Sequence, residues 1–258
     1  MNASPTRSRT RILSPGDPEP LIVQNAGGTS PLVLVCDHAG QVIPKALDGL
    51  GLRPGALDQH IGWDIGAGAL ASRLGERLDA CVMRQSYSRL VIDCNRPPDH
   101  PELVPDVSDG TAVPANRDLA PEDIQARLTA IHTPYHAGIA SLLDAREASG
   151  GPLFVVSVHS FTPMMNGEAR PWHVGVLHEG DSALSRRMLS LLRGEDGLVV
   201  GDNQPYALGS SDYTVPLHAQ ARGRDYLELE VRQDLIAEAS GQVRFADLLA
   251  RLLQSGKG

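Results

Sequence analysis

The chain has 258 residues, of which 41% are hydrophobic, and its formal net charge at pH 7 is −8. This length allows a sizeable core in one domain or in two small ones. The negative charge argues against nucleic acid as a partner, because binding to phosphates needs clustered Lys and Arg. No apolar run approaches the roughly 20 residues that cross a membrane, and the N-terminus has no secretory signal. Three scattered cysteines fit reduced thiols, so we expect a cytoplasmic protein without membrane partners.

Residues 1–20 are polar and rich in Arg and Pro, so we expect a flexible tail ahead of a single domain at 21–258. Apolar runs predict buried strands, and apolar residues spaced four apart predict helices. In the first half of the chain we predict a strand at 32–36, a helix at 64–78, strands around 80–84 and at 89–93, and a helix from 121 to about 148 with a break at Pro134. In the second half we predict strands at 153–158 and 173–177, a helix from a cap at Asp181 to Gly194, a strand at 226–232 and a helix at about 243–253. This alternation predicts an α/β domain. The Pro- and Asp-rich stretch 97–120 is long enough to be functional or disordered, and the sequence does not say whether it forms a lid.

Two of the predicted strands run into a histidine. LVLVC is followed by Asp37 and His38, and LFVVSV is followed by His159. Ligands of open α/β sheets bind outside the carboxyl ends of the strands, and a pair of imidazoles is the usual frame of a catalytic zinc site. A buried ring bonded to a backbone carbonyl explains each histidine about equally well, but the two together favour a metal site.

The strand predicted at 89–93 runs into Asn95 and Arg96. The guanidinium of an arginine is a planar fork of donors that fits a carboxylate, and the asparagine amide adds another donor. We therefore predict a carboxylate clamp beside the metal site. Asp93 either orients the Arg96 guanidinium or a metal-bound histidine, or it only caps the loop.

Two further carboxylates have alternative explanations. Asp64 either ligates a metal or caps the helix that is predicted to begin there. On the strand 226–232, alternation places Glu228, Glu230 and Arg232 on one face. A solvated edge strand explains this charged face. A buried Glu230 that faces activated water would instead be a general base, and Arg232 would keep a neighbouring carboxylate ionised.

Six motifs in order carry a resemblance to a known family: CDHAG with a following IP, HIGWDIGA, SYSRLVIDCNRP, VHSF, GDNQPY and LELEVRQDL. Over roughly residues 32–235 they resemble the N-formylglutamate amidohydrolase family, especially its branch of predicted bacterial members. This family is similar in fold to the zinc-dependent exopeptidases and the aspartoacylase group, a phosphorylase/hydrolase-like architecture. The resemblance therefore implies a three-layer α/β/α domain with a mostly parallel mixed sheet.

The resemblance also implies roles for individual residues. By position, His38 and His159 bind one ion of zinc or another divalent metal, and Glu230 is the base. In the related enzymes a His-x-x-Glu pair supplies two of the ligands, but the position three after His38 is Gln41. The carboxylate ligand must then come from elsewhere, and we expect it to be Asp64. Without Asp64 as a ligand, the site would hold metal weakly or not at all.

The implied reaction converts N-formyl-L-glutamate and water to formate and L-glutamate, as at the end of histidine degradation. Asn95 and Arg96 are expected to anchor one carboxylate of this small-molecule substrate, and Arg89 or Arg232 the other. Two alternatives remain open. One is a zinc carboxypeptidase or deacylase that acts on another N-acyl amino acid or peptide. The other is a non-catalytic anion-binding homologue without metal, which Gln41 favours. The sequence does not address the oligomeric state.

Overall fold

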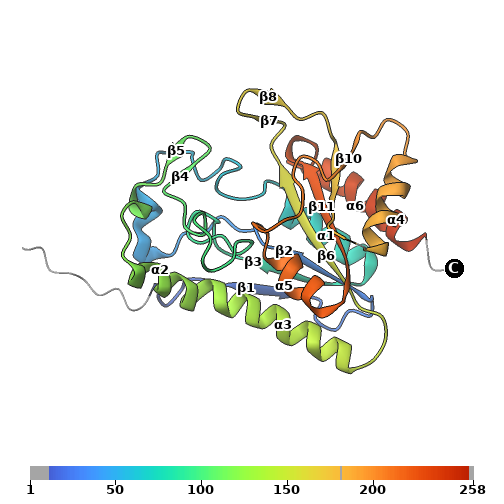
Figure 1. The fold of residues 1–258 in the computed structure, drawn as a ribbon, viewed down its shortest axis with the longest axis horizontal. Coiled ribbons are helices and arrows are strands. Elements are labelled where there is room, and N and C mark those ends of the chain that lie inside the picture. The colour runs from blue at the N-terminus through green and yellow to red at the C-terminus, as the bar shows by residue number, and fades with distance from the viewer. Residues whose placement is uncertain (1–11, 181, 256–258) are drawn as a thin grey trace, which may run out of the picture.

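A mixed sheet forms the centre of the structure, a computed structural model that describes residues 12–180 and 182–255. In these residues the sheet has seven strands in the order β1-β3-β2-β6-β11-β9-β10 (Figure 1). They are Leu21–Gln24 (β1), Leu32–Cys36 (β2), Cys81–Gln85 (β3), Phe154–Phe161 (β6), Val174–Leu177 (β9), Val200–Asp202 (β10) and Asp225–Arg232 (β11). Strands β3, β2, β6 and β11 run parallel, as do β9 and β10, whereas β1 and β9 pair antiparallel with β3 and β11. The predicted mostly parallel mixed sheet is confirmed.

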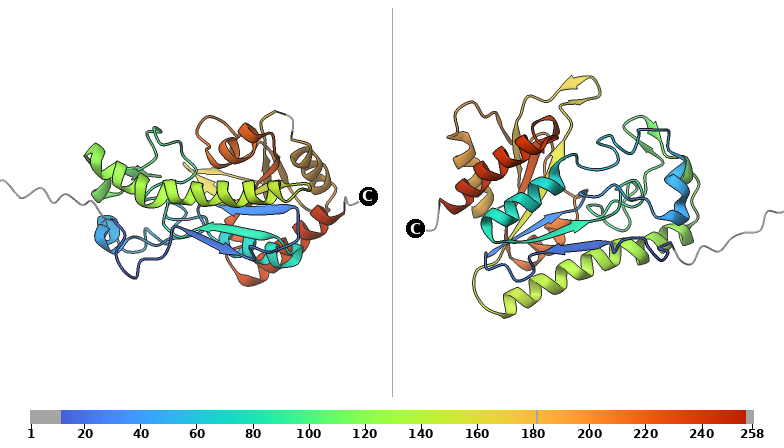
Figure 2. Two further views of the ribbon diagram at one scale, coloured as in Figure 1. Left: turned by 90° about the horizontal axis from the view of Figure 1, so that it is seen from below. Right: turned by 180° about the vertical axis from the view of Figure 1, so that it is seen from behind.

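Helices cover both faces of this sheet (Figure 2). One face packs against Ala67–Leu78 (α1), Ala183–Arg193 (α4) and Ala239–Gln254 (α6), and the other against Pro121–Arg127 (α2), Thr133–Ala148 (α3) and Thr214–His218 (α5). Successive side chains of a strand point to opposite faces, so in β2 Leu34 enters the core under α1 while Val33 and Val35 enter the other core. The predicted three-layer α/β/α architecture is therefore confirmed. Short 3-10 helices occupy Lys45–Gly51, Pro114–Asn116, Gln220–Arg222 and Gln233–Leu235.

The helix α1 begins at Ala67, three residues later than predicted. Gly66 precedes it with a φ of 82°, and a Cβ at Gly66 would lie 2.2 Å from the carbonyl oxygen of Ile236. Only glycine fits this left-handed turn against a neighbouring backbone. Because Gly66 is the N-cap, Asp64 does not cap the helix, and its side chain faces other partners.

Residues 89–93 do not form the predicted strand but a series of turns. Leu90 and Val91 are fully buried, as their apolar character suggested. Their carbonyl groups, however, accept hydrogen bonds from side chains: from Asn116 to Leu90 and from Arg127 to Val91, both at 2.8 Å. These side chains satisfy backbone groups that a sheet would otherwise pair. An apolar run predicts burial more safely than it predicts an extended backbone.

The long helix predicted from Pro121 is divided where a break was expected. A π-helical turn, Leu128–His132, separates α2 from α3 and ends directly before the first turn of α3, which contains Pro134. Proline has no N–H to donate and is tolerated in the first turn of a helix. The π-helical turn accommodates Pro134, and the chain continues from α2 into α3.

Part of the expected N-terminal tail belongs to the domain. Residues 1–11 lie outside the described residues. Residues 12–20 pack against the body, since Ile12 is buried in the core and the hydroxyl of Ser86 donates a 2.6 Å hydrogen bond to the carbonyl of Glu19. Residues 12–20 are therefore not a flexible tail, because the apolar side chain of Ile12 already anchors the chain.

The remaining helices lie close to their predicted places. The expected cap at Asp181 falls outside the described residues, and the Ser182 side chain accepts a hydrogen bond from the backbone N–H of Ser185 at the start of α4. The helix ends before Gly194, as predicted, and α6 begins at Ala239, four residues early. The three cysteines are buried and free, as expected. Among the described residues, no helix has the length and apolar character to span a membrane.

Replacing Leu74 on α1 by alanine should destabilise the fold. The side chain is fully buried between α1 and the sheet, and removing it leaves a cavity, which typically lowers the free energy of unfolding by about 2–5 kcal/mol. Urea denaturation measures this change. Glu76→Ala, at an exposed position of the same helix, is the control and should shift the free energy by less than about 0.5 kcal/mol. Equal effects of the two substitutions would contradict the assigned packing of α1.

Candidate active site

A cavity of about 300 Å³ lies at the carboxyl ends of β2, β6 and β11. Its walls also include the loop before α1, the stretch 89–109 and the loop 206–212. Met165 adds to the wall from the hairpin of Met164–Met165 (β7) and Glu168–Ala169 (β8). The Pro- and Asp-rich stretch contributes a second hairpin, Val107–Ser108 (β4) and Thr111–Ala112 (β5), whose first strand and turn line the cavity. The cavity is therefore where an open α/β sheet binds its ligands.

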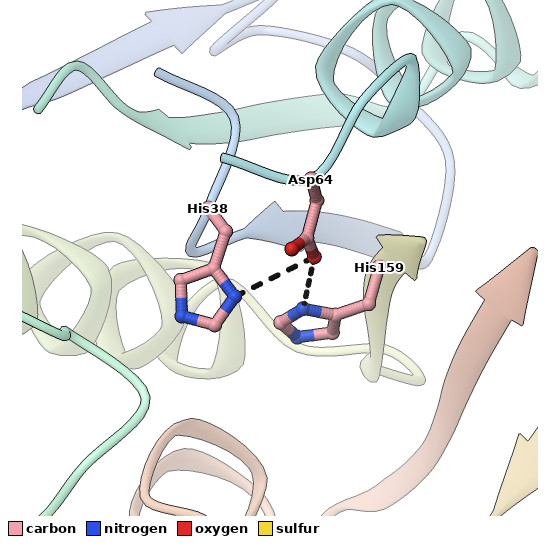
Figure 3. Close-up of side chains that lie close together, drawn as sticks. All are labelled: His38, Asp64 and His159. Carbon is pink, nitrogen blue, oxygen red and sulfur yellow. Dashed lines mark hydrogen bonds and ion pairs between the residues drawn. The ribbon is translucent and has the colours of Figure 1, made fainter. Parts of the chain in front are cut away.

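Three of the predicted metal ligands, His38, Asp64 and His159, meet in this cavity (Figure 3). Nδ1 of His159 lies 2.9 Å from Oδ2 of Asp64, and Nδ1 of His38 lies 3.5 Å from the same oxygen. All three side chains are buried, and one ligand atom from each lies within 4.8 Å of the others. Two imidazole nitrogens and a carboxylate around one point form a donor set that suits zinc or a similar divalent ion.

Each of these histidines has a second carboxylate on its other ring nitrogen. Nε2 of His38 lies 2.7 Å from Oδ1 of Asp93, and Nε2 of His159 lies 3.5 Å from Oδ2 of Asp37. The hydrogen bond to Asp93 holds a proton on Nε2 of His38, so that Nδ1 of this ring is left for a metal. Asp37 lies beside Nε2 of His159 without a hydrogen bond, and its charge favours a proton on that nitrogen. Contact with a histidine was one of the alternatives expected for Asp93, whereas no role was predicted for Asp37. An acid between a buried strand and His38 was the signal that pointed to it.

Asp37 is itself fixed from two directions. Its Oδ1 accepts hydrogen bonds of 2.8 Å from the hydroxyl of Tyr135 on α3 and from the hydroxyl of Thr214 on α5. Burial alone would raise the pKa of Asp37, but the contact with His159 outweighs burial and lowers this pKa to about 2. The helices on one face of the sheet thereby hold an ionised carboxylate against the metal-ligand group.

The buried charges of the group stabilise one another. Burial alone would raise the pKa of Asp64, but His38 and His159 hold it well below its usual range. Burial would lower the pKa of His159, but Asp37 and Asp64 raise it well above its usual range. The carboxylates therefore favour positive charge between them. Either protons on the imidazoles or a metal ion can supply this charge. A metal fits the residues present, because Nδ1 of His38 is buried and has no hydrogen-bond partner in the described part of the chain.

Strand β11 places two glutamates, Glu228 and Glu230, in the cavity, while Leu229 between them enters the core. This alternation was predicted. Glu230 lies beside His159 in the parallel register of β11 and β6. Burial raises the pKa of Glu230 to about 7, against the opposing effect of His159. A carboxyl group that titrates near neutrality beside a metal site is suited to take up and release a proton.

Asn95 and Arg96 line the cavity, but both are bonded to a neighbouring loop. Oδ1 of Asn95 accepts hydrogen bonds from the backbone N–H groups of Tyr213 and Thr214, each at 3.0 Å. Nη1 of Arg96 donates to the carbonyl of Ser211 at 3.0 Å, whereas its Nε lies 3.8 Å from Oε2 of the exposed Glu102 and makes no hydrogen bond in the described part of the chain. The amide of Asn95 thus fixes a loop, and Arg96 is the member of the pair with a donor left for a ligand.

The two arginines expected at a second carboxylate lie in different places. Arg89 lines the cavity, where its Nη2 donates to Asp93 at 2.7 Å and its Nη1 lies 3.6 Å from Asp64. Arg232 does not line the cavity. Its guanidinium donates to Asp234 at 2.8 and 3.2 Å and faces backbone carbonyls of 170–172. Arg232 is therefore a structural residue and not the substrate-binding one that was expected, because an acid two residues along the chain captures it.

Two buried histidines of the helical segment around Pro134 support the loop that carries Arg96. Nε2 of His132 lies 3.0 Å from the carbonyl oxygen of Arg96, and Nε2 of His136 lies 2.8 Å from that of Cys94. Burial lowers both pKa values, that of His136 to about 3. The neutral rings therefore donate to these carbonyls and fix the loop. Their i, i+4 spacing is the signal in the sequence, although Pro134 between them argues against a regular helix face.

Replacing Asn95 by alanine should destabilise the protein, because it leaves the backbone N–H groups of Tyr213 and Thr214 without their acceptor. The expected loss in the free energy of unfolding is about 1–3 kcal/mol, measured by urea denaturation. Gln59→Ala removes an exposed amide and should have an effect below about 0.5 kcal/mol. Unchanged stability of the Asn95 variant would mean that this amide serves a ligand and not the loop.

Comparisons with known proteins agree with this architecture. The family model described as N-formylglutamate amidohydrolase matches residues 30–237. Among solved structures, the gene product Atu2144 from Agrobacterium tumefaciens is 36% identical, with a TM-score of 0.91 over 94% of this chain and 96% of that one. An N-formylglutamate amidohydrolase from Ralstonia eutropha JMP134 is 19% identical and shares the fold, with a TM-score of 0.68 over 91% of this chain and 95% of that one. No curated protein matches the sequence. The chain belongs to the N-formylglutamate amidohydrolase family.

Proposed function

We propose that the protein is a metal-dependent amidohydrolase that cleaves the N-formyl or a similar N-acyl amide of an amino acid. The observation that carries this proposal is the buried group of His38, Asp64 and His159 beside Glu230 on the neighbouring strand. Membership of the family supports amide hydrolysis. The reference reaction is the conversion of N-formyl-L-glutamate and water to formate and L-glutamate.

His38, Asp64 and His159 would hold one divalent ion, for which zinc is the first choice. Such an ion supplies positive charge that polarises an amide carbonyl and eases the ionisation of water. Gln41 does not line the cavity, so it is not a substitute ligand at this point. Asp64 brings the carboxylate instead, from the loop before α1. This observation weakens the alternative of an anion-binding homologue without metal, which Gln41 had favoured.

Glu230 would take a proton from the attacking water and deliver it to the leaving amine nitrogen. Its pKa of about 7 lets the same carboxyl group act first as base and then as acid near neutral pH. Arg96 would bind the carboxylate of the amino acid product. Asn95 would act indirectly, by fixing the loop against which Arg96 is held.

A different deacylase remains as the second candidate function. The cavity of about 300 Å³ has room for an acyl group larger than formyl, and the proposed metal ligands and base would be the same for either substrate. A panel of N-formyl, N-acetyl and N-propionyl amino acids separates the two functions by the relative kcat/KM.

Protein purified without chelator should bind about one zinc ion per chain, and Asp93→Asn should weaken zinc affinity by about 10–100-fold. The reason is that the carboxylate on Nε2 of His38 raises the basicity of the ring and fixes its orientation. Competition with a chromophoric chelator measures the affinity. Asp58→Asn, at an exposed position, is the matched control. Equal affinities of the two variants would exclude His38 as a ligand oriented by Asp93.

Replacing Glu230 by glutamine should abolish catalysis without removing the metal. The amide cannot accept the proton of water, so kcat for formate release should fall by about 10²–10⁴-fold, while the zinc content stays near that of the parent protein. The readouts are formate release from the N-formyl amino acid panel and metal analysis of the same samples. Hydrolysis at the parent rate in this variant would exclude Glu230 as the base.

A further inference from the structure

The cavity carries more carboxyl groups than the proposed reaction uses. Seven acidic residues and two arginines line it. One of the arginines, Arg89, is already paired with Asp93 and Asp64. A single divalent ion at the metal-ligand group would still leave the acids in excess. A substrate with two carboxylates would add negative charge to this surplus, which like-charge repulsion opposes.

One of these acids, Glu228, lies deep in the cavity and has no role in the proposed chemistry. It is 2% exposed and points to the same face of β11 as Glu230. Its neighbours on the adjoining strands are Ser157 of β6 and Leu177 of β9. Two residues along a strand span roughly 7 Å. Glu228 therefore lies about that far below Glu230, on the side away from the carboxyl end of the strand.

The Glu228 carboxyl group has no hydrogen bond or ion pair to any residue in the described part of the chain, and it faces the cavity. Burial raises its pKa to about 8 against the opposing effect of His159, and Asp212 and Glu230 add smaller contributions that raise it further. A buried carboxyl group without a partner is costly to the fold, and such groups in a cleft are typical of ligand sites. A positively charged ligand group would form an ion pair with the Glu228 carboxylate. It would also reduce the excess of negative charge in the cavity.

We propose that Glu228 binds an ammonium or guanidinium group on the side chain of the substrate, which is then an N-acyl derivative of a basic amino acid. This inference rests on the proposed function and narrows its substrate class. The scissile amide would lie at the level of His159 and Glu230, and the α-carboxylate at Arg96. The side chain would extend down the cavity to Glu228, over a distance comparable with an extended lysine side chain.

The test compares kcat/KM for formate release from N-formyl-L-lysine, N-formyl-L-norleucine and N-formyl-L-glutamate by zinc-loaded protein. We expect the parent protein to prefer the lysine substrate over norleucine by about tenfold or more, and glutamate to be the poorest of the three. Glu228→Gln should reduce the preference for lysine over norleucine by about tenfold or more. Glu168 is an exposed glutamate on β8 outside the cavity lining, so the control Glu168→Gln should leave the preference for lysine over norleucine unchanged. Urea denaturation and zinc content show whether each variant is folded and loaded.

Two results would overturn the inference: a preference for glutamate by the parent protein, or an equal loss on all three substrates in the folded Glu228 variant. Failure of the proposed function has a different signature, namely no hydrolysis of any substrate by protein that holds zinc. In that case the inference is tested by calorimetric measurement of the binding of the free amino acids to the protein. L-lysine should bind the parent protein at least about tenfold more tightly than L-norleucine, and Glu228→Gln should remove the difference. Equal binding of the two amino acids by the parent protein would refute it.

Discussion

The contact of one carboxylate, Asp64, with the two imidazoles of His38 and His159 is the interaction on which the site depends. The three residues come from a loop after β2, a loop before α1 and the strand β6, so the contact joins distant parts of the chain. Burying such charges is unfavourable unless they compensate one another closely. Asp93 and Asp37 add negative charge at the other ring nitrogens of the two histidines. Side chains of the helices α3 and α5 donate hydrogen bonds to Asp37 and hold it in place. The residues that hold the fold together here are therefore the same residues that shape the site.

The parallel sheet explains why so many functional groups meet. Its central strands all end at one edge, and the register of β6 and β11 sets Glu230 beside His159 without any loop between them. Groups on paired strands keep their spacing better than groups on loops do, which suits the proposed base and the proposed metal ligand. The loops around the cavity contribute the rest of its lining, including Arg96.

Periodicity in the sequence was sufficient for the main elements, because buried strands and amphipathic helices have strong patterns of apolar residues. It failed at 89–93, where Leu90 and Val91 are buried but side chains of Asn116 and Arg127 bond their carbonyls. No local pattern reports such long-range bonds. The proposed ligands were found from histidines at the ends of apolar runs and from the family resemblance. Arg232 was misplaced because the sequence does not show which nearby acid an arginine will reach.

Oδ1 of Asn95 accepts hydrogen bonds from the backbone N–H groups of Tyr213 and Thr214, and these two bonds join segments that are more than a hundred residues apart in the chain. Hydrogen bonds from Asn95 to Asp212 and from Arg96 to Ser211 extend this connection to the end of the loop 206–212. A substitution that moves one of these segments would have to be matched in the other to keep both hydrogen bonds. The proposed metal ligands lie outside the two segments, so this wall of the cavity can be changed as a unit while His38, Asp64 and His159 are left in place.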